Sequence, residues 1–231
     1  MSMESQESSL QLDLLAWYEV NKKAVFIGLG LIVVAVGVGI VWKHHTRAVA
    51  EEASSALLAV RIKAGETNTM SVDALLAVAQ QHAGTPAAGQ AQLLAGRELF
   101  NKGKYAEARA KFESVANDAS DPLQAIGLYG LAACYDAENK LTDALKAYAG
   151  VVAAPSGAPF ANQARLAKAS LHEALKQPKE ALALYDEIVA SKSSALANDA
   201  LQRKSTLLRA HPELDKPATL TNSVKVLPAA K

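Results

Sequence analysis

The sequence predicts an all-α protein in which a single transmembrane helix precedes an α-solenoid of about four divergent helix pairs. Two observations predict this class. An uninterrupted apolar segment occupies residues 24–42, and alanine-centred motifs recur every 34 to 37 residues through the rest of the chain. Aromatic residues make up only 5 % of the chain while alanine is abundant, a composition that favours closely packed helices over β-sheet.

The apolar segment at residues 24–42 reads AVFIGLGLIVVAVGVGIVW and contains no charged side chain. At a rise of ~1.5 Å per residue, a helix of this length extends about 28 Å, close to the ~30 Å hydrocarbon core of a bilayer. We therefore expect it to cross the lipid bilayer. Aromatic and basic residues near its two ends are expected to lie in the membrane interfaces: Trp17, Tyr18, Lys22, Lys23, Trp42 and Lys43.

A cleaved signal peptide is the main alternative, because Ala48-Val49-Ala50 has the form of a cleavage site. However, the residues before position 24 include four acidic and two basic side chains, whereas the start of a signal peptide is positively charged. The apolar segment also exceeds the usual ~7–15 residues of a signal core. A retained anchor is therefore favoured. Lysine and arginine are nearly balanced on the two sides, so charge alone leaves the orientation open.

A repeated motif organises the rest of the chain. Copies read GKYAEARAKFESV at 103–115, NKLTDALKAYAGV at 139–151 and PKEALALYDEI at 178–188, and a weaker copy runs from Ala74 to Pro86. The central alanines are separated by 34, 36 and 37 residues: Ala74, Ala108, Ala144 and Ala181. The motif resembles a tetratricopeptide repeat, in which two antiparallel helices approach closely at small residues. Coincidental alanine-rich helices are the alternative.

The expected helices of this part follow from the motif and from breaker residues between its copies. They cover residues 45–64, 70–82, 88–102, 105–117, 122–138, 141–152, 159–175, 178–190 and 194–210. The transmembrane helix is expected to run continuously or nearly so into the first of them. Phe112, Tyr148 and Tyr185 are expected to fill the space toward the neighbouring repeat.

Four segments are expected along the chain. They are a cytoplasmic N-terminal segment at 1–23 with a short amphipathic helix at 8–20, the transmembrane helix at 24–42, the repeat domain at 43–210 and a flexible tail at 211–231. Within the tail, TLTNSVKVL at 219–227 has a composition that would allow it to add a strand to a partner.

Signatures of catalysis and of cofactor or metal binding are missing from the sequence. His172-Glu173 begins an HExxH-like string, but Lys176 stands where the second histidine belongs. Cys134 is the single cysteine, which excludes an internal disulfide, and its neighbours predict a core position. Beyond residue 42 the net charge is only +3, too mild for nucleic-acid binding. We expect a non-enzymatic protein with no cofactor and no small-molecule substrate.

Binding remains as the expected role, because the first helices of successive repeats line a concave groove. Aligned on the repeat frame, the groove positions are Leu93, Arg97, Asn101, Tyr129, Ala133, Asp136, Leu166, Ser170 and Glu173. Repeat proteins that hold a terminal carboxylate use paired lysine and asparagine there, whereas this chain offers Arg97 and Asn101 only once. A broad, weakly apolar contact with a helix or extended chain is favoured. A solvated surface without a partner is the alternative.

The order of segments resembles the YfgM-like ancillary subunits of the bacterial Sec translocon. The resemblance covers most of residues 10–210 and rests on the acidic N-terminus, the span at 24–42 and the divergent repeats, with FNKGKYAEARAKF at 100–112 as the most specific stretch. It implies a single-pass protein of the bacterial inner membrane with a cytoplasmic N-terminus and periplasmic repeats. The implied partners are the SecYEG translocon and a membrane-anchored, prolyl-isomerase-like periplasmic chaperone.

The resemblance implies an adaptor that helps to pass translocated polypeptides to periplasmic chaperones. A self-associating structural organiser in envelope assembly or cell division is the alternative. It is suggested by the small-xxx-small spacings Ala24/Gly28 and Ala35/Gly39 in the apolar segment, which favour helix–helix contact in membranes.

Overall fold

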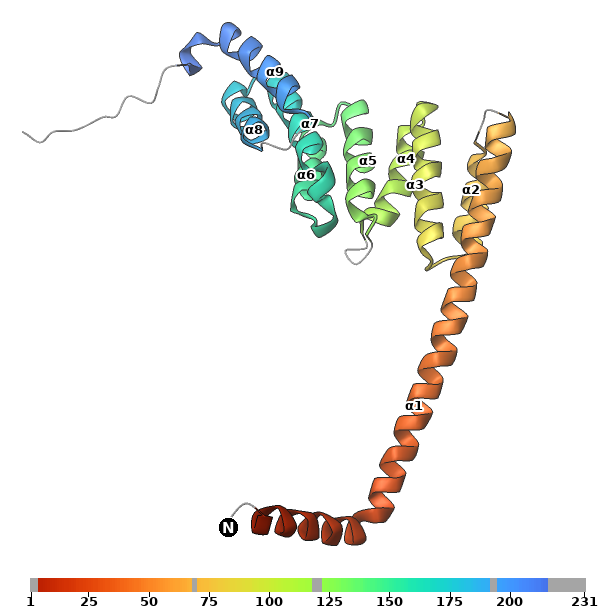
Figure 1. Cartoon of the computed structure of the whole chain (residues 1–231). Helices are drawn as coiled ribbons and strands as arrows, with labels where there is room; N and C mark the ends of the chain where they lie inside the picture. The colour runs from red at the N-terminus through yellow and green to blue at the C-terminus, as the bar shows by residue number, and fades with distance from the viewer. Residues whose placement is uncertain (1–3, 68–69, 118–121, 192–194, 216–231) are drawn as a thin grey trace, which may run out of the picture. The chain divides into compact units, whose positions relative to one another are not determined.

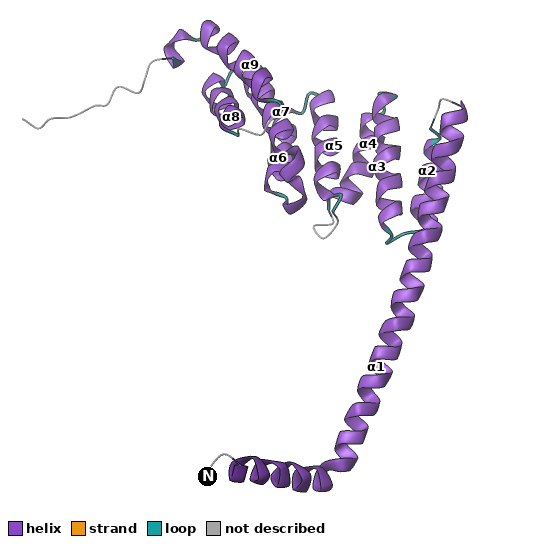
Figure 2. Cartoon of the chain, in the orientation of Figure 1, coloured by secondary structure: helices purple, strands orange, loops and turns teal. Residues whose placement is uncertain are grey.

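The computed structural model describes residues 4–67, 70–117, 122–191 and 195–215. Within these residues all regular structure is helical (Figure 2). The predicted all-α class is therefore confirmed. The segment 219–227, for which strand addition is expected, lies outside the described residues.

The helices follow one another along the chain with short connections (Figure 1). They are α1 (Glu4–Thr67), α2 (Val72–Gln81), α3 (Pro86–Asn101), α4 (Tyr105–Ala116), α5 (Gln124–Ala137), α6 (Leu141–Ala153), the 3₁₀ helix η1 (Pro155–Phe160), α7 (Ala161–Ala174), α8 (Pro178–Ala190), α9 (Ala197–Ala210) and the 3₁₀ helix η2 (Pro212–Leu214).

The chain divides into two compact units, residues 1–55 and residues 56–231. In the first unit the large apolar side chains described between residues 26 and 42 are all exposed, including Leu31 and Val33. The stretch Val20–Glu66 of α1 contains a window of mean hydropathy 2.8, none of which is buried. By length and composition this helix is able to cross a membrane.

Helix α1 is longer than the sequence predicts. A separate short helix is expected at 8–20, whereas the structure has one helix from Glu4 to Thr67. No proline precedes Pro86, so each backbone N–H in this stretch is available for the helical hydrogen-bond ladder. The glycines of the apolar segment lower helix propensity but remove no donor. The helix therefore continues past the expected boundary near residue 20, although Figure 1 shows that α1 changes direction sharply after its N-terminal stretch.

In the second unit, each helix from α2 to α9 packs against the next helix along the chain. Figure 1 shows the helices α3 to α8 as successive antiparallel pairs, and α9 follows the last pair. This arrangement is the expected solenoid of helix pairs.

The repeat motif marks the core of this unit. Ala108, Ala144 and Ala181 are completely buried, as the close approach of paired helices requires. The weaker first copy differs, because Leu75 is completely buried there while Ala74 is only half-buried. The aromatic residues expected between repeats are also buried: Phe112, Tyr148 and Tyr185.

The turns inside the three helix pairs share one backbone geometry. Gly103, Asn139 and Lys176 have φ values of 73°, 58° and 60°, in the left-handed region. The residue after each of them donates its N–H back to a carbonyl of the preceding helix, at 2.9, 2.8 and 2.8 Å. These are Schellman-type C-caps, in which one residue with positive φ ends the helix. The turns therefore repeat at the same 36- and 37-residue spacing as the alanines.

The connection from α6 to α7 differs from the expected helix at 159–175. The structure has the 3₁₀ helix η1 before α7 begins at Ala161. Gly157 is buried there, and a Cβ at this position would collide with the carbonyl oxygen of Val151. The α-helix is therefore delayed by a tight turn that packs against α6.

Candidate protein-binding groove

An open cavity of about 590 Å³ lies on the repeat unit between α3 and α5. Its size falls within the ~300–1,000 Å³ typical of ligand sites in proteins. Side chains from α3 and α5 supply most of the lining, α4 supplies one and Arg61 of α1 supplies another. The lining residues are Arg61, Gln90, Leu93, Leu94, Arg97, Phe100, Phe112, Leu123, Ile126, Tyr129, Gly130 and Ala133. We call this feature the α3–α5 cavity.

The Phe112 ring of α4 lines the α3–α5 cavity and is held by two glycines. A Cβ added to Gly96 of α3 would lie 2.9 Å from this ring, and one added to Gly130 of α5 would lie 2.5 Å from it. Both distances are shorter than van der Waals contact, so only glycine leaves room for the ring at these two positions. The close approach of α3 and α5 to α4 thus keeps the ring in place at the cavity.

Tyr129 of α5 forms part of the wall. Its ring contacts Tyr148 of α6 edge to face, with centroids 5.3 Å apart and planes inclined at 73°. Burial raises the pKa of the Tyr129 hydroxyl, and burial also raises the pKa of Tyr148. Both hydroxyl groups are therefore neutral at physiological pH and add no negative charge to the site.

The charged residues that line the cavity are both basic. Arg61 and Arg97 contribute positive charge, and no aspartate or glutamate is among the lining residues. The Arg97 side chain is 58 % exposed, and its Nη2 atom lies 3.8 Å from Glu98 Oε1. An exposed contact of this length contributes little, so the Arg97 guanidinium keeps donors for another acceptor.

The nine predicted groove residues separate into two groups. Leu93, Arg97, Tyr129 and Ala133 line the cavity together. Asn101 and Asp136 are exposed and lie outside its lining. The other three, Leu166, Ser170 and Glu173, belong to α7.

The α7 residues make contacts within the chain. Arg203 of α9 donates to Ser170 Oγ at 3.2 Å, and the Tyr185 hydroxyl donates to the Glu173 carboxylate. Leu166 packs against the buried cluster that contains Tyr185. The structure therefore does not bring the nine residues into one site.

Several residues of the α3–α5 cavity are missing from the prediction. The repeat frame selects only one line of positions on each first helix, so it omits neighbours such as Leu94 and Ile126. Arg61 lies before the first repeat copy, where that frame provides no position for it. Leu94 and Phe100 lie three residues before and after Arg97, and this one-face helical spacing is the signal that would have found part of the lining.

The residues considered for catalysis, Cys134 and His172, make packing and turn contacts within the chain. Cys134 is completely buried and packs with Leu99 and Phe112, and burial raises its pKa to about 11. Its thiol is therefore protonated and unreactive, as the predicted core position requires. His172 Nδ1 lies 2.7 Å from Gln177 Oε1, within the turn that follows α7. Among the described residues, no three His, Cys, Asp or Glu side chains gather as a set of metal ligands.

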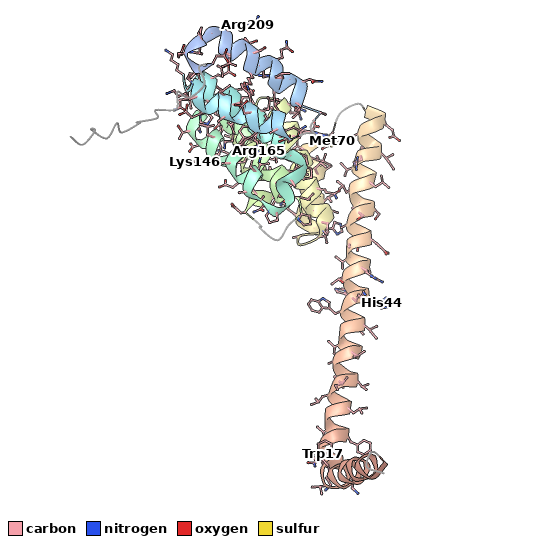
Figure 3. All side chains as sticks on the ribbon, turned by 60° about the vertical axis from the view of Figure 1, so that its left-hand side comes forward. Trp17, His44, Met70, Lys146, Arg165 and Arg209 are labelled. Atoms are coloured by element: carbon pink, nitrogen blue, oxygen red, sulfur yellow. The ribbon has the colours of Figure 1, made fainter. Side chains whose placement is uncertain are left out.

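The predicted interface residues lie on α1. Trp17 and Trp42 are 58 % and 72 % exposed, and Figure 3 shows Trp17 and His44 projecting from the helix. The side chains of the predicted basic residues are also exposed: Lys22, Lys23 and Lys43. The side chain of Tyr18 lies outside the described residues. The exposed residues are available for contact with lipid headgroups.

The helix pairs, their shared turns and the groove on their first helices define a tetratricopeptide-like α-solenoid, a class of protein-interaction scaffold. A model of the tetratricopeptide repeat-like domain family matches residues 15–210. The chain therefore belongs to this family.

Solved structures agree on the fold. A crystal structure of nearly identical TPR-like repeats, from a Podosopora anserina protein described as a kinesin light chain, is similar with a TM-score of 0.50 and 20 % sequence identity. The alignment covers 74 % of this chain and 90 % of that chain. A single-substitution variant of the same protein gives a TM-score of 0.50 at 19 % identity and the same coverage. No curated protein matches the chain.

Proposed function

We propose that this protein is a non-enzymatic adaptor of the bacterial inner membrane that associates with the SecYEG translocon and helps to pass translocated polypeptides to periplasmic chaperones. One of its proposed partners is a membrane-anchored, prolyl-isomerase-like chaperone. In this arrangement the N-terminus is cytoplasmic and the repeats are periplasmic.

The observation that carries this proposal is the direct connection of an apolar helix to an interaction scaffold. Helix α1 contains the apolar segment 24–42 and continues to Thr67, within the unit that holds the repeats. A binding scaffold attached in this way is restricted to partners at or near the membrane surface. The effective concentration of such partners is high, so weak contacts are sufficient for association.

The choice of the Sec channel as partner rests on the resemblance in segment order described above. A scaffold beside this channel meets polypeptides before they fold, while their apolar side chains are still exposed. The apolar lining of the α3–α5 cavity is suited to such clients.

Site-specific photocrosslinking in native membranes tests the proposed partners. A crosslinking amino acid at Trp42 is expected to capture SecYEG subunits, and one at Tyr129 is expected to capture a client or a chaperone. Lys146 of α6 serves as a control position, because its side chain is 77 % exposed and lies outside the cavity lining. Recovery of only unrelated proteins from Trp42 and Tyr129 would contradict the proposal.

Protease accessibility tests the proposed topology independently. Protease added to spheroplasts is expected to digest the repeat unit, because that unit is proposed to face the periplasm. Protection of the repeats until the membrane is dissolved would contradict this orientation.

A self-associating organiser is the second candidate. A Cβ added to Gly28 or Gly39 would meet no atom within 4 Å, so a second helix has room to approach at these residues. Size analysis in mild detergent discriminates between the candidates, because a strict monomer leaves self-association without support.

A further inference from the structure

The opening of the α3–α5 cavity is bordered by exposed residues of three helices. Arg61 of α1, Gln90 and Arg97 of α3, and Ile126 of α5 are all exposed while also lining the cavity. The cavity is therefore accessible to a polypeptide from outside. Its interior is formed mainly by leucine and aromatic side chains, which gain from the burial of apolar groups.

The apolar surface continues on α1 beside Arg61. Leu58 and Ile62 are 55 % and 57 % exposed, although large apolar side chains in the repeat unit are mostly buried. They are four residues apart, so they lie one above the other on a single face of the helix. The exposed face of α1 near Arg61 therefore combines apolar and basic side chains.

The charge of the cavity selects among apolar partners. Arg61 and Arg97 lie on different helices and both contribute to the lining, which contains no acidic side chain. A lysine or arginine in the ligand would meet like charge there, whereas a carboxylate would accept hydrogen bonds from a guanidinium. This charge excludes the basic tail of the chain as a favourable occupant, because its titratable residues beyond Asp215 are lysines.

We propose that the α3–α5 cavity binds an acidic, apolar segment of a partner polypeptide. Leucine or phenylalanine side chains of the segment enter the cavity over the Phe112 ring, and aspartate or glutamate side chains pair with Arg61 and Arg97. This assignment rests on the proposed function, since it names the chemistry of the chains that the adaptor receives.

Peptide binding to the full-length chain in phosphatidylcholine nanodiscs tests the assignment. The probes are a short fluorescein-labelled peptide of leucine, phenylalanine and glutamate, and a twin with lysine in place of glutamate. The glutamate peptide is expected to bind at least about tenfold more tightly than its twin. Equal binding of the two peptides would overturn the proposal.

Two pairs of variants locate the binding site. Arg97→Glu is expected to weaken binding of the glutamate peptide by at least about tenfold, while Arg209→Glu on α9 leaves it unchanged. Figure 3 shows Arg209 on α9, and its side chain is exposed and outside the cavity lining. Ala133→Leu fills the cavity and is expected to weaken binding, whereas Ala137→Leu on an exposed turn of the same helix is not.

Circular dichroism confirms that each variant is folded before its binding is compared. Equal affinities within either pair would overturn the assignment. Oleate, which is apolar and carries a carboxylate, serves as a lipid probe. Binding of oleate that is lost in Arg97→Glu, without binding of the glutamate peptide, would also overturn the assignment. If SecYEG crosslinks form from Trp42 but the peptide does not bind, only the cavity assignment is refuted. Peptide binding without those crosslinks refutes only the Sec association.

Discussion

Equivalent repeat positions have different surroundings at the two ends of the repeat array. Arg97, Ala133 and Ser170 occupy equivalent positions, spaced by 36 and 37 residues, on α3, α5 and α7. The first two line an open apolar cavity, whereas Ser170 accepts a hydrogen bond from Arg203 of the following helix. The repeat spacing therefore specifies where the helices pack. The side chain at each position decides whether the surface is open to a partner or occupied by a contact within the chain.

At the cavity end, the Phe112 ring fills the space between Gly96 and Gly130 and is expected to contribute strongly to stability. Phe112→Ala is expected to destabilise the repeat unit by about 3–5 kcal/mol, because the deletion removes a buried ring and leaves a void between Gly96 and Gly130. Urea unfolding of the full-length chain, followed by circular dichroism, measures the effect. Leu201→Ala on α9 is the control, since Leu201 is 53 % exposed. Similar losses for the two variants would contradict the role of Phe112.

A pair of glycine substitutions tests the close packing around Phe112. Gly130→Ala places a Cβ 2.5 Å from the Phe112 ring and is expected to cost about 1–3 kcal/mol in unfolding free energy. Gly150→Ala places its Cβ 3.5 Å from Leu128, at ordinary contact distance, and is expected to stabilise the helix by about 0.5–1 kcal/mol. Unfolding measurements on both variants should therefore change in opposite directions. A change of the same sign in both would contradict the packing described here.

At the opposite end of the array, a hydrogen bond joins the buried Tyr185 of α8 to Glu173 of α7. Tyr185→Phe removes the hydroxyl that donates to Glu173 and is expected to cost about 1 kcal/mol. Tyr129→Phe is the matched control, because no hydrogen bond of the Tyr129 hydroxyl contributes to the packing described above. The same unfolding assay compares the two variants. A larger loss for Tyr129→Phe would show that polar contacts are more important at the cavity end.

The turns provide the smallest expected effect. Lys176 adopts a φ of 60°, which is unfavourable for a residue with a Cβ. Lys176→Gly is therefore expected to raise the unfolding free energy by up to about 1 kcal/mol, whereas Gly103→Ala at the equivalent turn should lower it by a similar amount. Unchanged unfolding free energy in both variants would indicate that a positive φ at these two turns does not disfavour a residue with a Cβ.

The helices were largely predictable, because local signals mark their ends. Thr85 and Pro86 begin α3, with the Thr85 side chain accepting the Ala88 N–H at 3.2 Å, and Pro178 begins α8. The 3₁₀ helix η1 was not predictable from periodicity, because a short turn with prolines carries no apolar repeat. The continuation of the apolar helix into residues 45–64 is predicted by the sequence and present in α1. The joining of residues 8–20 to the same helix is not predicted, because charged residues before the apolar segment suggest a boundary that the backbone does not require.

The cavity was predictable only in part. The frame identified Leu93, Arg97, Tyr129 and Ala133 because equivalent positions on successive first helices face the same side. It could not identify Arg61, which depends on tertiary packing. Nor could it show that Ser170 is engaged by Arg203, because this contact joins side chains 33 residues apart.

Photocrosslinking from both ends of the array tests most directly whether binding belongs to the cavity. A crosslinking amino acid at Tyr129 and the same amino acid at Ser170 would be compared in native membranes, at equal expression. The proposal predicts polypeptide adducts at Tyr129 and few at Ser170. Equal adducts at the two positions, or adducts confined to Ser170, would contradict it.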